Sequence, residues 1–299
     1  MKLSQHQSTE FTKMLVEGDS GSGKTGGLAS LVKAGYWLGI IDMDNGLDSL
    51  KAFIERTCPD KVDNVEFRTI RDKRKSAPIG SVIDGTPTAF RQATEMLDRW
   101  KYKDDDGNIV DYGPPAEWGP DKILVIDSLT FLSDAAFDAG ELLVPRGAGG
   151  KYDERAVYRN AQKAIGYVLG LLSSKHFRTN VIVNSHIRYI DNEDGTRKGY
   201  PTAVGSALSP QIPRWFNSVA LCTTKVGGKR VIQTSATNLI DLKNPKPFDM
   251  KPEYPIETGL ADFFAVLRKE ATPPKPEKPK IAITTTTTTT NPVTQLRRR

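Results

Sequence analysis

A glycine-rich segment of eight residues near the N-terminus constrains the fold more than any other part of this sequence. It lies between a strand-like run (residues 14–17) and a helix-like run (residues 25–34). A bound phosphate chain needs several backbone N–H groups aimed at one point, a helix N-terminus behind them and a cation within reach. The segment supplies all three and predicts a phosphate-binding loop (P-loop) formed by Gly18, Asp19, Ser20, Gly21, Ser22, Gly23, Lys24 and Thr25.

Two side chains of this loop have specific expected roles in binding ATP. Lys24 is expected to bridge the β- and γ-phosphates, and the hydroxyl of Thr25 is expected to hold Mg²⁺. The three glycines permit a close approach of backbone to phosphate that side chains would block. A glycine-serine turn that matches the pattern by chance is the alternative, and the flanking strand and helix argue against it.

Two carboxylates that follow apolar runs are expected to complete the site. Asp127 ends the apolar run 122–127, where it can contact a metal ion through water, although it could instead cap the next helix. Asp44 follows the run 38–42, at the sheet edge where ligands bind in open parallel sheets. Asp44 is therefore the expected base for the attacking water, with Asp42 in that role, or a capping role, as alternatives.

Strand-like and helix-like runs alternate along most of the chain. The expected strands are 14–17, 38–42, 122–127, 181–184, 219–223 and 230–234, and the expected helices are 25–34, 47–56, 88–101 and 154–175. This alternation predicts an α/β fold, a P-loop NTPase core with a mostly parallel central sheet flanked by helices. Two glycine-rich stretches, 103–120 and 144–153, fit neither pattern and are expected to be loops.

The C-terminal composition separates a tail from the folded part. We expect one ATPase domain, residues 1–270, and a disordered Pro/Lys/Thr-rich basic tail, residues 271–299. The tail holds six lysines and arginines and one glutamate, so it carries five of the six net positive charges of the 299-residue chain. The rest is nearly neutral, so net charge does not mark the folded part as a nucleic-acid binder.

Cysteine usage and hydropathy bear on the compartment. Cys58 and Cys222 are isolated and lack metal-ligand spacing, which indicates buried thiols in a reducing compartment. The sequence has no run of eighteen or more apolar residues, and its first residues lack the apolar stretch of a signal peptide. We therefore expect a cytoplasmic protein.

The order of these motifs resembles that of the RecA-type recombinases. IIDMDNGLDSL resembles the segment with their catalytic acid, ILVIDSLTFL their Walker B strand, and VIVNSHIR the strand that ends in their γ-phosphate sensor. GYPTAVGSALSPQIPRWFNSVALCT resembles their second DNA-binding loop and the strand after it, and IDLKNPKPF resembles the segment whose lysines reach a neighbouring subunit's nucleotide. The resemblance spans residues 14–248 and implies a RecA-like core.

Carried over by position, the resemblance assigns roles to five residues. It implies Asp44 as the catalytic acid, Asp127 as the Walker B acid and His186 at the sensor position. It also implies that Lys243 and Lys246 act on the nucleotide of an adjacent subunit, although KNPK could equally be a polar turn. Asp44 is one methylene shorter than the usual glutamate and His186 replaces a glutamine, so slow or pH-sensitive hydrolysis would follow. An ordinary hydrogen-bonded strand end is the alternative for His186.

In size the chain resembles the compact bacteriophage RecA-like ATPases of the Sak group, which are implicated in single-strand annealing and recombination. Little sequence precedes the P-loop, so we expect no N-terminal polymerisation helix. The resemblance implies a homo-oligomer, a ring or a filament, that binds single-stranded DNA and works with a single-strand-binding protein. It also implies ATP and Mg²⁺ as cofactors and the cytoplasm of a bacterial host cell as the location.

Two basic loops are candidates for the DNA contact. Single strands bind in positive grooves that carry stacking or backbone-clamping groups. The loop that contains Arg188 also carries acidic residues, so an ordinary solvated loop without a DNA contact is the alternative for it. Rival functions are a kinase, helicase or packaging motor that does not respond to single-stranded DNA, and a DNA-binding module switched by nucleotide with little turnover. The candidate DNA-binding residues are Arg146 and Lys151 in one loop, and Arg188, Arg197 and Lys198 in the other.

Overall fold

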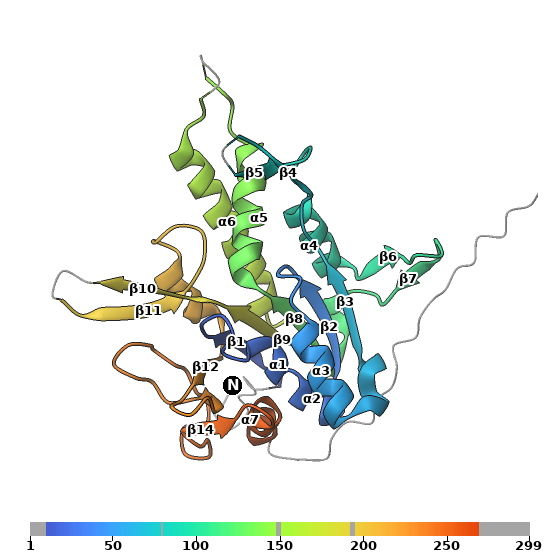
Figure 1. The fold of residues 1–299 in the computed structure, drawn as a ribbon, viewed down its shortest axis with the longest axis vertical. Coiled ribbons are helices and arrows are strands. Elements are labelled where there is room, and N and C mark those ends of the chain that lie inside the picture. The colour runs from blue at the N-terminus through green and yellow to red at the C-terminus, as the bar shows by residue number, and fades with distance from the viewer. Residues whose placement is uncertain (1–9, 79, 148–150, 192–194, 269–299) are drawn as a thin grey trace, which may run out of the picture.

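An eight-stranded sheet with helices on both faces organises the structure, a computed structural model that describes residues 10–78, 80–147, 151–191 and 195–268 (Figure 1). Its strand order is β14-β13-β12-β1-β9-β8-β2-β3. The six strands from β12 to β3 pair in parallel, and β13 and β14 extend one edge in antiparallel pairing. The strands are β1 (Lys13–Glu17), β2 (Trp37–Asp42), β3 (Val65–Thr69), β8 (Gly119–Asp127), β9 (Thr179–Ser185), β12 (Ser218–Thr224), β13 (Arg230–Gln233) and β14 (Glu253–Pro255).

Seven α-helices and three short 3₁₀ helices connect the described strands. The α-helices are α1 (Lys24–Gly27), α2 (Ala29–Lys33), α3 (Asp48–Thr57), α4 (Ala89–Asp98), α5 (Leu129–Glu141), α6 (Glu154–Ser173) and α7 (Gly259–Arg268). The 3₁₀ helices are η2 (Pro59–Asn64), η3 (Pro115–Glu117) and η4 (Ser209–Trp215).

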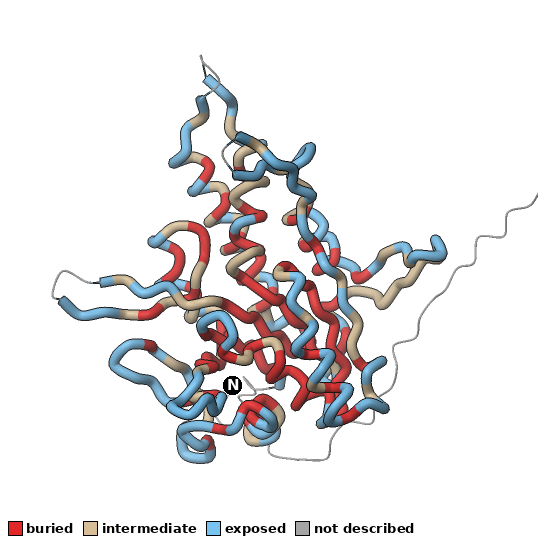
Figure 2. Tube along the Cα trace, in the orientation of Figure 1, coloured by how far each residue is buried: buried red, intermediate tan, exposed pale blue. Residues whose placement is uncertain are grey.

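The central strands are buried on both faces, which is why they are continuous apolar runs. Successive side chains of a strand point to opposite faces. In β1, Met14 and Val16 join a core with α2, α3 and α7, whereas Leu15 joins a second core with α4, α5 and α6. Figure 2 shows this buried centre, with exposed segments at the periphery. The predicted fold class, a mostly parallel sheet flanked by helices, is confirmed.

Three two-stranded hairpins project from this core. They are β4 (Arg74–Ser76) with β5 (Ser81–Ile83), β6 (Lys101–Lys103) with β7 (Ile109–Asp111), and β10 (Ile187–Asp191) with β11 (Arg197–Pro201). In Figure 1 the hairpins β6–β7 and β10–β11 extend on opposite sides, and α5 and α6 rise together beyond the sheet. None of the hairpins was expected from the sequence.

The insertion 103–120 contains strand β7, helix η3 and the buried Trp118, so its prediction as a loop is wrong. The helix expected to reach residue 101 ends at Asp98, because the backbone N–H of Trp100 donates to the carbonyl of Gly113 and the chain turns into hairpin β6–β7. Trp118 is buried, its ring lies 5.1 Å from that of Trp37, and its Nε1 donates to the carbonyl of Tyr112. The insertion therefore covers one end of the sheet with aromatic rings.

The parallel pairing brings the carboxyl ends of four central strands to one edge. Asp42 of β2 lies in register with Asp127 of β8, and Asp127 lies in register with Asn184 of β9. Glu17, the last residue of β1, lies in register with Ser185 of β9. The P-loop follows Glu17 directly, so the polar ends of all four strands surround it.

The proposed tail from residue 271, and part of the loop 144–153, lie outside the described residues. Within the described part of the chain, no helix has the length and apolar character that crossing a membrane requires. The boundary at residue 270 stays a prediction.

Gly39 of β2 provides a test of packing in the aromatic layer. A Cβ at this position would lie 2.7 Å from the ring of Trp118, so Gly39→Ala is expected to lower the free energy of unfolding by about 1–3 kcal/mol through overpacking. Thermal and urea unfolding measure the change. Gly166→Ala in α6 is the control, because its Cβ meets no atom within 4 Å and the change should stabilise the helix by about 0.5–1 kcal/mol. Equal stability of the two variants would contradict this account.

Candidate active site

The P-loop takes a conformation that depends on its glycines. Gly21 and Gly23 have φ values of 76° and 102°, in the left-handed region that side chains disfavour. A Cβ on Gly18 would lie 2.5 Å from the hydroxyl of Ser22 and 2.6 Å from the carbonyl oxygen of Cys222. The loop closes with the N–H of Ser22 donating to the carbonyl of Asp19, and α1 begins at Lys24. These constraints hold backbone N–H groups at a helix N-terminus, as anion binding requires.

Lys24 lies folded against the loop that it follows. Its Nζ donates to the carbonyl oxygens of Gly18, at 2.7 Å, and Asp19, at 2.9 Å. The side chain is buried, and this burial lowers the pKa of Lys24 from its ordinary value, while nearby carboxylates oppose the change. The ammonium group therefore lies where it can exchange carbonyl partners for phosphate oxygens.

Asp127 meets the P-loop through Thr25. The hydroxyl of Thr25 donates to Oδ2 of Asp127 at 2.7 Å, while Oδ1 of Asp127 is buried without a hydrogen-bond partner. The residue is 2 % exposed, and burial raises its pKa to about 6. A buried carboxylate without full hydrogen bonding is stabilised by a cation.

This pair has the chemistry of a magnesium site. Mg²⁺ prefers oxygen ligands and is usually held by one or two carboxylates together with substrate phosphates. Thr25 and Asp127 supply one hydroxyl and one carboxylate, and the orphaned Oδ1 is an available ligand. No cluster of three or more His, Cys, Asp or Glu side chains that could hold a metal by itself occurs among the described residues. The residues therefore fit a metal shared with a bound polyphosphate.

Asp44 faces the same cavity and is held by Ser128, the residue after Asp127. The hydroxyl of Ser128 donates to its Oδ1 at 2.9 Å, and burial raises the pKa of Asp44, with Asp42 adding to the effect. Asp42 is differently placed, because its two carboxylate oxygens accept from the N–H of Asn45 at 2.8 Å and from the hydroxyl of Thr69 at 2.7 Å. Asp42 fixes the loop after β2, which leaves Asp44 as the carboxylate of this pair that lines the cavity.

His186 lies at the end of β9, between the P-loop strand and the Asp127 strand. Its backbone N–H donates to the hydroxyl of Thr130 at 3.1 Å, and its Nδ1 lies 3.3 Å from the same oxygen. Burial lowers the pKa of His186, and the charge of Lys24 lowers it further. The imidazole is thus favoured in its neutral form, and it lines the cavity.

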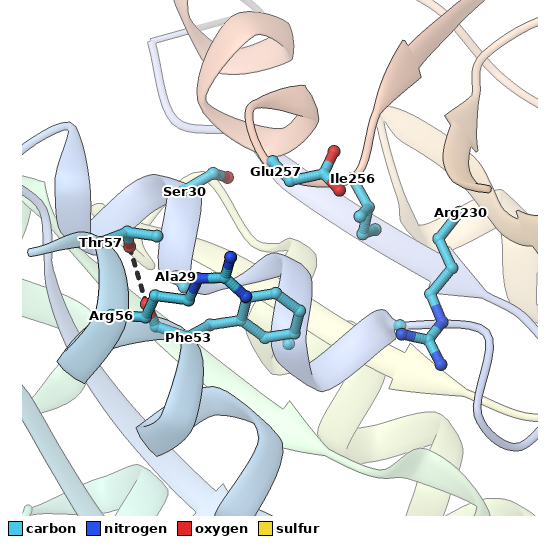
Figure 3. Close-up of a pocket in the computed structure, with 10 residues that line it drawn as sticks. Ala29, Ser30, Phe53, Arg56, Thr57, Arg230, Ile256 and Glu257 are labelled. Carbon is cyan, nitrogen blue, oxygen red and sulfur yellow. Dashed lines mark hydrogen bonds between the residues drawn. The ribbon is translucent and has the colours of Figure 1, made fainter. Parts of the chain in front are cut away.

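The structure gathers these side chains around a phosphate cavity of about 240 Å³. A second cavity of about 300 Å³, the adjoining cavity, shares Gly23, Gly26, Phe53 and Arg230 with it. Figure 3 shows the adjoining cavity, with Phe53 and Arg56 from α3 on one side and Ile256 and Glu257 on the other. The phosphate cavity is lined by Ser20, Gly21, Gly23, Lys24, Thr25, Gly26, Asp44, Gly46, Ser49, Phe53, Asp127, His186 and Arg230.

The structure does not bring Lys243 and Lys246 into this cavity. Nζ of Lys243 donates to the carbonyl of Phe216 at 2.7 Å. Nζ of Lys246 donates to the carbonyls of Val266 and Leu267 at 2.8 and 2.6 Å. Within the single chain, both ammonium groups are held by backbone carbonyls.

The residues predicted to bind DNA fall in two separate places. Arg188, Arg197 and Lys198 lie on hairpin β10–β11, where the guanidinium of Arg197 lies over the ring of Tyr189 at 4.9 Å. Arg146 and Lys151 lie in the connection between α5 and α6, of which residues 148–150 lie outside the described part. In Figure 1 the ends of α5 and α6 that lead into this connection lie at the top of the view, away from hairpin β10–β11.

Several residues of the two cavities were not predicted. Ser49 and Phe53 lie four residues apart on α3, so the helical spacing after Asp44 could have suggested that they share a face. Arg230 and Ile256 are separated from the P-loop by more than 200 residues, and no motif marks them. Only the pairing of β13 and β14 at the sheet edge brings these two residues to the site.

Comparisons with known proteins place the chain in a broad group. The family described as an AAA domain matches residues 10–245. No curated protein matches the chain significantly in sequence. Among solved structures, the RadB recombinase shares 14% identity over 83% of this chain and 89% of its own, with a TM-score of 0.43. A prototypical ATPase from the type III secretion system of pathogenic bacteria shares 12% identity over 71% of this chain and 52% of its own, with a TM-score of 0.35. Likenesses this distant carry no information on substrate or partner.

Another buried carboxylate, Glu17, lies directly before the P-loop. It is 1 % exposed, and its Oε2 has no hydrogen-bond partner. Burial raises its pKa to about 8, and Asp241 adds to the effect. The folded protein therefore binds a proton on the Glu17 carboxyl more tightly than the unfolded chain does. Proton binding at Glu17 makes its full contribution to the free energy of unfolding at pH values below the pKa of the unfolded chain. This contribution is lost as the pH rises toward 8.

The proton on Glu17 predicts a pH-dependent stability. Between about pH 5.5 and 7.5, this group alone should lower the free energy of unfolding by about 1.4 kcal/mol per pH unit. Glu17→Gln, which does not titrate, is expected to flatten the profile by this amount. Urea unfolding at several pH values measures it, with Glu117→Gln at an exposed site as the control. Parallel profiles for wild type and Glu17→Gln would show that Glu17 is not protonated in the folded protein.

Proposed function

Since the chain belongs to the AAA domain family, we propose that it is a Mg²⁺-dependent ATPase with a RecA-like core that acts on single-stranded DNA in bacteriophage recombination and annealing. The observation that supports the activity best is the convergence of four side chains on one cavity. Lys24 and Thr25 from the P-loop meet Asp127 and Asp44, which follow two neighbouring parallel strands. These groups supply what phosphoryl transfer to water needs: phosphate binding, metal ligands and a base.

Each residue has a proposed role in hydrolysis. The P-loop N–H groups and Lys24 bind the phosphate chain, and Thr25 and Asp127 hold Mg²⁺. When bound, the metal ion neutralises charge that develops on the phosphates. Asp44, held by Ser128, orients the attacking water and accepts its proton, and its raised pKa suits a base better than an ordinary aspartate's. His186 senses the terminal phosphate from the end of β9.

The adjoining cavity is the proposed place of the nucleoside. It shares Gly23 and Gly26 with the phosphate cavity, so it lies where the rest of a nucleotide with its phosphates on the P-loop would extend. Its walls offer the ring of Phe53 and the side chain of Ile256 as apolar surfaces (Figure 3). Such a slot is a suitable site for a planar base.

DNA coupling is proposed to pass through His186. Hairpin β10–β11 begins at Ile187, the next residue, and the N–H of Thr202 at the end of the hairpin donates to the carbonyl of His186 at 2.7 Å. The hairpin offers Arg188, Arg197 and the ring of Tyr189, groups that bind phosphates and stack on bases. Arg188 lies two residues after His186 in the sequence, so DNA bound at the base of the hairpin would lie near the proposed phosphate sensor. Arg146 and Lys151 are proposed as a second contact, and Lys198 as a third cation on the hairpin.

Assembly is proposed to complete the site. In a ring or filament, Lys243 and Lys246 would reach the nucleotide of the adjacent protomer, for which each Nζ must leave the carbonyls that it contacts in the single chain. A cation added in this way makes hydrolysis depend on assembly. A single-strand-binding protein is the proposed further partner, and the host cytoplasm the proposed location.

Steady-state ATP hydrolysis tests this proposal. We expect turnover that rises with single-stranded DNA and with protein concentration. Lys24→Ala is expected to reduce kcat/KM about 100-fold or more, and Lys243→Ala to remove the concentration dependence. Lys163→Ala, at an exposed site on α6, is the control. Turnover indifferent to DNA and Lys243 would favour a kinase-like enzyme or motor, and DNA binding without turnover would favour a nucleotide-switched module.

The DNA contact on hairpin β10–β11 has its own test. Replacing Arg188 and Arg197 together by Ala should weaken binding of a labelled oligonucleotide about tenfold and reduce the salt dependence of log K by about 1.4, at about 0.7 per phosphate contact. The matched control replaces Lys101 and Lys103, two exposed lysines of hairpin β6–β7, by Ala. Equal affinity of the two double variants would remove hairpin β10–β11 from the DNA site.

A further inference from the structure

The side chain of Arg230 contacts the P-loop although the two are more than 200 residues apart in the sequence. It is the first residue of β13, and its Nε donates to the carbonyl oxygen of Gly21 at 3.0 Å. Its Cδ lies 3.1 Å from the position that a Cβ on Gly23 would occupy. The side chain therefore lies directly on the loop, and the glycine at 23 leaves room for it.

The guanidinium lies at the boundary between the two cavities. Arg230 lines both the phosphate cavity and the adjoining cavity. In Figure 3 its side chain extends along the edge of the adjoining cavity, opposite Phe53. A ligand that occupied both cavities would therefore lie against this group.

The side chain retains donors for such a ligand. A guanidinium is always charged and carries five N–H donors, and its planar fork matches phosphate oxygens. Among the hydrogen bonds of the described residues, that to Gly21 uses Nε. The two terminal nitrogens, with four N–H groups, are the fork that binds phosphate in a bidentate manner.

The charges that line the phosphate cavity also favour a role for Arg230 in phosphate binding. Among the residues that line this cavity, Lys24 and Arg230 are the basic side chains, and Asp44 and Asp127 are the carboxylates. With both cations present the two signs balance. Without Arg230, the two carboxylates outnumber the one remaining basic side chain, so a polyphosphate would depend on Lys24 and a bound metal ion for positive charge.

We propose that Arg230 is a second phosphate-binding cation of this site, supplied by the same chain through strand β13. This inference rests on the proposed nucleotide binding and adds a residue to it. Arg230 binds the phosphate chain next to the nucleoside, while Lys24 binds it at the P-loop. Lys243 and Lys246 cannot do so within the single chain, because their Nζ atoms contact backbone carbonyls elsewhere.

A purely structural role is the competing explanation. In that case Arg230 would only brace the loop through Gly21, and its loss would lower the stability of the free protein without a specific effect on phosphate. Two ligands separate the explanations. Inorganic triphosphate has no nucleoside, so its binding reports phosphate contacts alone, and ATP reports the whole site.

The experiment measures the affinity of ATP and inorganic triphosphate, with Mg²⁺, by titration calorimetry. Arg230→Ala and Arg230→Gln are each expected to weaken both ligands about 10- to 100-fold, the loss typical of a charged hydrogen bond. Arg230→Lys, which keeps the charge and loses the fork, is expected to recover part of this affinity. Lys229→Ala is the matched control, because this exposed neighbour lines neither cavity.

The outcomes distinguish failure of this inference from failure of the proposed function. If wild type binds neither ligand, or Lys24→Ala binds as tightly as wild type, the proposed nucleotide site is wrong. If wild type binds and Lys24→Ala does not, but the Arg230 variants match Lys229→Ala, this inference alone is overturned. Melting temperatures without ligand identify variants that do not fold, and Arg230→Lys then decides: wild-type affinity for triphosphate overturns the bidentate contact, and weakened affinity supports it.

Discussion

The burial of Asp127 at the end of an apolar strand is the constraint on which the site depends. A carboxylate that is 2 % exposed is costly unless neighbours or a cation stabilise it. The Thr25 hydroxyl accounts for one oxygen, and the other is left without a partner. Because β8 lies between β2 and β9, this oxygen is surrounded by the polar ends of parallel strands, which is where the P-loop and Asp44 lie. The sheet thus places a carboxylate that a cation would stabilise beside a loop whose N–H groups are suited to binding an anion.

Much of the fold could be predicted because the burial of its central strands determines their sequence pattern. Strands buried on both faces read as apolar runs, and all six expected strands are present within a few residues of their predicted ends. The edge strand β3 was missed, since its alternating exposure leaves no such run. Helices α5 and α7 were missed although their sequences are amphipathic, so that signal was available. The aromatic layer around Trp118 could not be predicted, because it depends on contacts between segments distant in sequence.

The candidate site likewise contains residues that local sequence patterns predict and residues that they do not. Motif residues such as Lys24, Thr25 and Asp127 have local signatures, since their chemistry requires a loop, a helix start or a strand end. The structure brings them together with Asp44 and His186. Arg230 and Ile256 have no local signature, because strand pairing at the sheet edge places them. For Lys243 and Lys246 the opposite holds. The motif resemblance points to both lysines, but within the single chain their side chains lie away from the cavity.

The tight packing of the first turn of the P-loop helix has a consequence for how the molecule opens. A Cβ on Gly26 would lie 2.9 Å from the ring of Phe53, and one on Gly27 would lie 2.9 Å from Ile256, so this turn is enclosed between α3 and the segment that joins β14 to α7. A ligand on the P-loop would contact both neighbours at once. By thermodynamic linkage, any ligand that binds only the closed arrangement stabilises it in proportion to the logarithm of the ligand concentration. Movement of Phe53 or Ile256 away from this turn would therefore be coupled to release of such a ligand.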